Sequence, residues 1–195
     1  MIARVSRLCI YAAGLTCISS FALHGQDSPP RRHRPGDVIP KLDLVSMEGM
    51  EVTTWPAEGK FLLVLAWDIR SPRVDALAKS SLMLFRRFHD QGLEVITLCR
   101  ANSEDDIFDL AARWQLPWPV VSDAGDPRPS RKLAIRAIPA GILVGPDGKV
   151  LAADLEGERA HAVMAEAMEL SLDDLPMPKE PNPLQAPPKG RSPSR

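Results

Sequence analysis

The strongest constraint on the fold is the stretch from residue 61 to 75, which reads FLLVLAWDIRSPRVD. An apolar run opens this stretch and ends in a charged loop, after which Ser71-Pro72 begins a helical pattern. A continuous apolar run bounded by a polar loop predicts a buried strand. Serine at an N-cap and proline at the first helical position are preferred at helix starts. The stretch therefore predicts a strand that leads directly into a helix.

The two ends of the chain differ in composition from its middle. Residues 1–25 contain Arg4 and Arg7, no acidic residue and an apolar run, which is the layout of a secretory signal peptide. The run is shorter than the roughly 20 apolar residues that cross a bilayer. An uncleaved signal is the alternative, and it is the only membrane attachment that we expect. Proline is frequent in the flanks, which predicts a Pro/Arg-rich linker over 26–40, a folded domain over 41–172 and a disordered tail over 173–195.

Charge and histidine positions exclude several classes of function. The formal net charge is −1, and such a near-neutral balance gives no support for a nucleic-acid partner. His33, His89 and His161 are scattered without the spacing of metal ligands, so we expect no metal site. No motif for a cofactor is present either. We therefore expect neither a metal nor a cofactor.

Cysteine usage restricts the redox chemistry that is possible. Cys9 and Cys17 lie inside the predicted signal peptide, so an exported chain would carry Cys99 alone. A single cysteine cannot form an internal disulfide. The exported domain must therefore be held together by its core.

The apolar periodicity predicts an α/β domain. Strands are expected in the middle of the chain at 61–67, 93–99 and 120–122, with helices between them and a terminal helix over 156–172. Turn residues at Met47-Glu48-Gly49 and at Gly145-Pro146-Asp147-Gly148 predict two hairpins, one near each end of the domain. Strands that alternate with helices favour a parallel pair, to which the second hairpin adds antiparallel strands.

Several short motifs, in order along residues 36–170, resemble a thioredoxin-fold domain of the branch that includes periplasmic thiol-disulfide oxidoreductases and peroxiredoxin relatives. The resemblance implies a central mixed sheet with helices on both faces and an N-terminal β-hairpin. It also implies an exported protein of the periplasm or extracytoplasmic envelope. The motifs are Gly36-Asp37 with Pro40, Gly59-Lys60, Ala66-Trp67, Ile138-Pro139 and the stretch from Gly145 to Val150.

The resemblance fails at the reactive atoms. Members of that family carry two cysteines, separated by two residues, after the first core strand. In this chain the corresponding segment reads Ser71-Pro72-Arg73-Val74, with Ser71 and Val74 at the cysteine positions. We interpret this segment as a degenerate active-site loop that is retained as a helix start.

Cys99 has two interpretations. It ends a predicted core strand, and in a parallel sheet that end lies on the same edge as the loop before Pro72. A thiol at that edge could be catalytic if neighbouring arginines lowered its pKa. The other interpretation is a buried cysteine that packs as a small hydrophobic residue, because free cysteine is among the most buried residue types.

Ile138-Pro139 resembles the cis-proline of the family, where the preceding backbone pairs with an extended peptide. The leading hypothesis is therefore an exported thioredoxin-like protein without dithiol chemistry, which acts as a binding or structural module. Its partner would be an extended peptide or envelope protein at a groove between Ser71 and Pro139. The alternative is a single-cysteine thiol oxidoreductase or peroxidase that uses Cys99.

Overall fold

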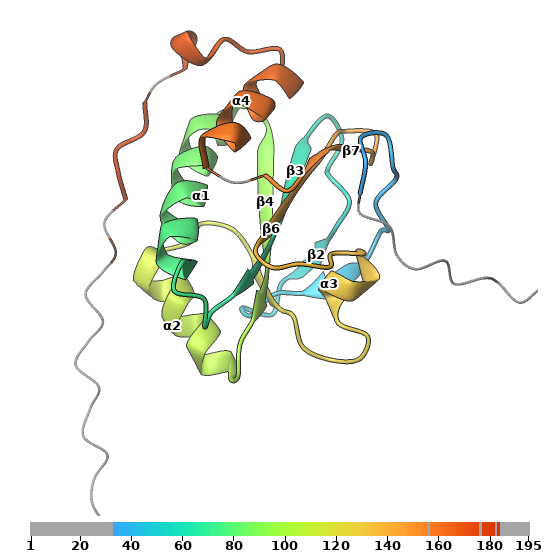
Figure 1. Ribbon diagram of the computed structural model, residues 1–195, viewed down its shortest axis with the longest axis vertical. Helices are drawn as coiled ribbons and strands as arrows, with labels where there is room; N and C mark the ends of the chain where they lie inside the picture. Colours follow the sequence, from blue (N-terminus) through green and yellow to red (C-terminus); the bar gives the residue numbers. More distant parts are fainter. Residues whose placement is uncertain (1–32, 156, 176, 182, 184–195) are drawn as a thin grey trace, which may run out of the picture.

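The computed structural model describes residues 33–155, 157–175, 177–181 and 183 (Figure 1). The predicted signal peptide, residues 26–32 of the predicted linker and residues 184–195 lie outside the described residues. The strands are β1 (Asp43–Val45), β2 (Glu51–Thr53), β3 (Phe61–Asp68), β4 (Leu93–Arg100), β5 (Val120–Ser122), β6 (Ala140–Val144) and β7 (Val150–Ala153). The helices are α1 (Val74–Phe88), α2 (Glu104–Trp114), α3 (Pro129–Lys132) and α4 (Gly157–Ala167), with 3₁₀ turns at His89–Gln91 and Leu172–Asp174.

The central sheet is mixed and has five strands in the order β5-β4-β3-β6-β7. β3 pairs in parallel with β4, and β4 pairs in parallel with β5, through the crossover helices α1 and α2. β6 runs antiparallel to β3, and β7 antiparallel to β6. β1 and β2 form the separate antiparallel pair that the N-terminal pattern predicts. The mixed sheet and the N-terminal hairpin are therefore confirmed.

Alternate residues of β3 point to two cores. Leu63 and Trp67 pack under α1, α2 and α4, which all cover one face of the sheet (Figure 1). This arrangement follows from two consecutive parallel crossovers, because right-handed connections that advance in one direction place their helices on the same face. Val64 and Ala66 face the opposite core, which contains Leu133 at the end of α3. Helices on both faces are confirmed; among the described helices, the four-residue α3 lies on the second face, where residues of β1 and β2 also pack.

Two side chains fix α2. The Ser103 hydroxyl accepts a hydrogen bond from the Asp106 N–H at 3.3 Å, which caps the helix. At the other end, the buried Trp114 indole Nε1–H donates to the Asp75 carboxylate of α1 at 2.7 Å. A buried indole that has an acceptor avoids the cost of an unsatisfied donor. The bond therefore ties the end of α2 to the start of α1.

The folded domain extends beyond the predicted limits of 41 and 172. Gly36 N–H donates to Val150 O at 2.8 Å, and Ile39 is fully buried, so residues 36–39 close the outer edge of β7. At the other edge, Met47 N–H donates to Val120 O of β5 at 2.8 Å. The linker was predicted to reach residue 40, but residues 36–39 already belong to the folded domain. An extended segment that contains proline can still pair with a strand edge.

The described part of the predicted disordered tail also contacts the domain. Arg86 of α1 donates to Lys179 O at 3.0 Å, and Lys79 pairs with Glu180 at 2.9 Å. Pro181 is buried. Figure 1 shows this segment running along the outer side of α1. Prolines prevent the segment from forming a helix, but they do not prevent it from packing against one.

Candidate functional site

The loop from Ile69 to Arg73 joins β3 to α1 at the carboxyl edge of the sheet. Ser71 N–H donates to Asp68 O at 2.9 Å, and the Ser71 hydroxyl accepts from the Arg73 N–H at 3.3 Å. The N-cap of α1 is Arg73, so the prediction of Ser71 as N-cap is wrong by two residues. The serine closes a local turn before the helix, a conformation that competes with helix formation. Pro72 lies within that turn.

Ser71 and Val74 provide no redox-active sulfur at the carboxyl edge. The Ser71 hydroxyl is occupied by the turn, and Val74 is 8 % exposed and belongs to the core under α1. The Val74 N–H donates to Ser71 O at 3.1 Å, which brings the two residues onto one helical turn. This spacing suits a pair of cysteines. Here the two positions hold a serine whose hydroxyl is hydrogen-bonded and a valine that packs in the core.

Cys99 lies on β4 directly beside Trp67 of β3 and is fully buried. Burial, together with the smaller effect of the Asp68 and Asp123 carboxylates, raises the pKa of the Cys99 thiol to about 12. These carboxylates have the opposite effect to the arginines that the catalytic interpretation invokes. A thiol in this state is protonated at neutral pH and is a poor nucleophile. The catalytic role of Cys99 stays a prediction that this geometry does not support.

Asp68 and Arg70 form a close ion pair at the end of β3. Arg70 Nε donates to Asp68 Oδ1 at 2.9 Å, its Nη2 donates to Oδ2 at 2.6 Å, and its backbone N–H also donates to Oδ1. The hydrogen bonds from the Arg70 side chain lower the pKa of Asp68 to about 2, although partial burial opposes them. A two-pronged arrangement of this kind is the strongest common geometry for arginine and a carboxylate.

The Asp68 pair has a testable pH dependence. The pKa of Asp68 is about 2 in the folded state and 3.8 without the fold, so the pair stabilises the fold above about pH 4. The contribution disappears as pH falls from about 4 to about 2. Because the Arg70 side chain is exposed and the pair is screened by solvent, we expect its contribution to stability to be small. Carbon-13 NMR of the Asp68 carboxyl would measure the pKa.

Arg70→Gln serves as the control for this titration. Without the guanidinium, the pKa of Asp68 should rise toward 3.8. If Asp68 titrates at its ordinary pKa in the unmodified protein, the ion pair is not formed in solution.

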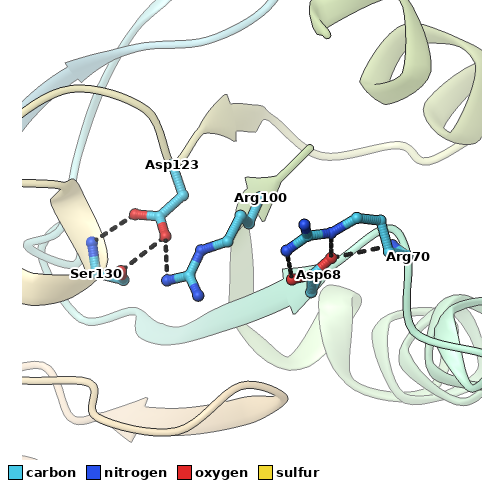
Figure 2. A network of polar contacts seen from close by, with 5 residues as sticks. All are labelled: Asp68, Arg70, Arg100, Asp123 and Ser130. Carbon is cyan, nitrogen blue, oxygen red and sulfur yellow. Dashed lines mark hydrogen bonds and ion pairs between the residues drawn. The ribbon is translucent and has the colours of Figure 1, made fainter. Parts of the chain in front are cut away.

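A second polar network lies across the ends of β4 and β5, as Figure 2 shows. Asp123 is buried, and its carboxylate accepts three hydrogen bonds, from Arg100 Nη2 at 3.1 Å, Ser130 N–H at 2.8 Å and Ser130 Oγ at 2.7 Å. Arg100 lies opposite Asp68 in the β3–β4 register and lowers the pKa of that carboxyl as well. The sequence analysis missed this network. The available signal was an aspartate placed directly after a predicted strand.

The peptide bond between Ile138 and Pro139 is cis. Pro139 lines a cavity of about 20 Å³ together with Trp67 and Leu77, so the fold brings this loop beside the start of α1. A cavity of that size holds about one water molecule and is not itself a ligand site. The Ile138 backbone takes part in no hydrogen bond within the described part of the chain. Its N–H and C=O groups are therefore free for a partner.

The described residues contain no group of three or more histidine, cysteine, aspartate or glutamate side chains that could hold a metal ion. Among the same residues, no helix has the length and apolar character needed to span a membrane.

Comparison with solved structures identifies the architecture. A thiol:disulfide interchange protein from Bacteroides sp. superposes with a TM-score of 0.63 at 21 % identity, over 72 % of this chain and 94 % of that one. The thioredoxin domain of a thiol-disulfide oxidoreductase from Bacteroides vulgatus gives a TM-score of 0.60 at 22 % identity, over 70 % and 99 %. A thioredoxin-family thiol:disulfide interchange protein from Chlorobium tepidum gives 0.60 at 14 % identity, over 71 % and 99 %.

The chain has the thioredoxin fold. No family model and no curated protein sequence matches the chain. At these identities the likeness establishes the thioredoxin fold alone, so the chemistry of this site has to be argued from its own residues.

Proposed function

We propose that this thioredoxin-fold domain is an exported binding module of the bacterial envelope that carries out no dithiol chemistry. The observation that supports it most is the state of Cys99, which is the free cysteine of the described residues, fully buried, with its pKa raised to about 12. Disulfide exchange requires an accessible thiolate. The apolar run and flanking arginines of residues 1–25 support export.

Serine is a poor substitute for the missing nucleophile. The environment of a helix N-terminus can lower a cysteine pKa from about 8.5 to about 3.5. An alcohol starts several pKa units above a thiol, so the same shift would still leave its pKa well above neutral pH. Ser71 would therefore stay protonated, and its hydroxyl already accepts the Arg73 N–H.

The proposed ligand is an extended peptide, such as a segment of an envelope protein, that pairs with the backbone beside Pro139. The unpaired N–H and C=O groups of Ile138 support this assignment, because an extended peptide binds through backbone hydrogen bonds of this kind. The groove would be bounded on its other side by the turn at Ser71.

The proposal predicts that Cys99 is inert in the folded protein. At pH 8 a thiol with a pKa of about 12 is ionised in only about one molecule in ten thousand, and burial blocks access as well. We therefore expect iodoacetamide to modify Cys99 only after denaturation. In parallel, the protein should not accelerate insulin reduction by dithiothreitol beyond a Cys99→Ser control.

Two results would contradict the proposal. Insulin reduction that is lost in Cys99→Ser would assign catalysis to this thiol, as the single-cysteine alternative requires. Alkylation of the folded protein at the rate of a small free thiol would show that the burial of Cys99 is not maintained in solution.

A further inference from the structure

An open cleft lined by arginines lies beside the network of Figure 2. It is formed by the end of β4 and by residues 125–136, which include α3. Its volume is about 650 Å³, within the range of roughly 300 to 1,000 Å³ that is usual for small-molecule sites. Four of its nine lining residues are arginines, namely Arg100, Arg128, Arg131 and Arg136.

The charge in the cleft is unbalanced. Arg128, Arg131 and Arg136 are exposed, and none of them forms an ion pair with a described residue. Asp126 is the one carboxylate among the nine lining residues, and Asp123 is paired with Arg100. Asp68 acts on Arg100 as well but is held by Arg70, and Asp154 lines the neighbouring pocket with Arg136. The lining residues and Asp123 together carry four guanidinium groups and two carboxylates, a surplus of two positive charges.

Arg100 is the anchored member of the group. Its Nη2 is held by Asp123, which is itself fixed by two hydrogen bonds from Ser130. Its Nε is buried and has no hydrogen-bond partner in the described structure. A guanidinium that is already held on one side loses little side-chain entropy when a ligand binds to its exposed part.

We propose that this cleft binds a small molecule with at least two oxyanion groups, either phosphates or carboxylates. Guanidinium groups match both kinds of oxyanion through paired N–H donors. The cleft also lies outside the carboxyl ends of β4 and β5, where α/β sheets usually place their ligands. Ser71, Ile138 and Pro139 are not among the lining residues of the cleft, so this proposal does not rest on the proposed peptide groove.

Isothermal titration of the full-length protein with pyrophosphate and with citrate tests the site. We expect one of the two anions to bind with one-to-one stoichiometry in about 0.15 M salt, a concentration at which weak, non-specific attraction between exposed charges is largely screened. The anion that binds more tightly shows whether the cleft prefers phosphate groups or carboxylate groups. The double variant Arg131→Gln/Arg136→Gln should weaken binding about a hundredfold, since each of the two lost charged hydrogen bonds costs roughly a factor of ten.

Arg159→Gln is the matched control, because Arg159 is exposed on α4 and therefore on the opposite face of the sheet from α3. This variant should bind the anion as the unmodified protein does. The proposal fails if neither anion binds, or if Arg159→Gln weakens binding as much as the double variant does. Binding of a hexaglutamate peptide without binding of either small anion would also overturn it, since the partner would then be an acidic protein segment.

Discussion

The double variant Ser71→Cys/Val74→Cys is expected to reduce insulin with dithiothreitol as the electron donor, whereas the unmodified protein does not. The two residues share one helical turn, with the Val74 N–H bonded to Ser71 O at 3.1 Å, so their sulfurs could form and break a disulfide. A thiol at such a position commonly has a pKa near 7. Its thiolate fraction at pH 8 would exceed that of Cys99 on the order of ten thousandfold.

The single variants Ser71→Cys and Val74→Cys are the controls for this gain of activity. Neither can close a disulfide within the loop, so neither should turn over. A double variant that forms the disulfide but still fails to reduce insulin would contradict the interpretation. It would show that the surrounding loop has also lost what dithiol exchange requires.

The second large effect is expected at Asp123. Replacing Asp123 with alanine removes the acceptor of three hydrogen bonds and leaves Arg100 and Ser130 without their partner. The Asp123 side chain is fully buried, while that of Arg100 is 29 % exposed, so water can compensate only part of the loss. We expect the free energy of unfolding to fall by about 2 to 4 kcal/mol, measured by urea denaturation.

Ser130→Ala provides the comparison for Asp123→Ala. It removes only the 2.7 Å hydroxyl bond and should cost about 1 kcal/mol, because the backbone N–H of residue 130 still donates to Asp123. Equal losses in the two variants would mean that Arg100 adds nothing to the network. A loss below about 1 kcal/mol for Asp123→Ala would show that the network is not formed in solution.

Much of the fold could be predicted from the sequence because its signals are local. The apolar run at 61–67, the turn at 145–148 and the cap at Ser103 each specify an element through neighbouring residues alone. The parallel part of the sheet follows from the order of these elements, since parallel crossovers have one hand. The thioredoxin fold was predicted from the resemblance of the short motifs to that family. The strand at 120–122 was placed at its observed bounds, although it is only three residues long.

The candidate site was harder to predict because it depends on register. Arg100 and Asp123 are 23 positions apart, and they meet only because Cys99 pairs with Ser122 in the parallel ladder. The state of Cys99 also required the structure. A strand end at the carboxyl edge can be open or covered, and here the thiol lies on the face that α1 and α2 cover.

The predicted domain boundaries at residues 41 and 172 were wrong for a related reason. Ile39 and Pro181 are buried, but they lie in proline-rich segments without apolar periodicity, which a search for regular elements passes over. Such segments gain their order from the surface to which they bind. That surface is not visible in the segment's own sequence.

One upstream stretch, residues 36–47, bonds to both outer strands of the central sheet, to β7 through Gly36 and to β5 through Met47. Open strand edges are templates for pairing with other chains, and natural proteins cover or interrupt them. Here a single segment protects both edges at once. Proteolytic removal of that segment would therefore convert a self-contained domain into one with two exposed edges, each able to start edge-to-edge aggregation.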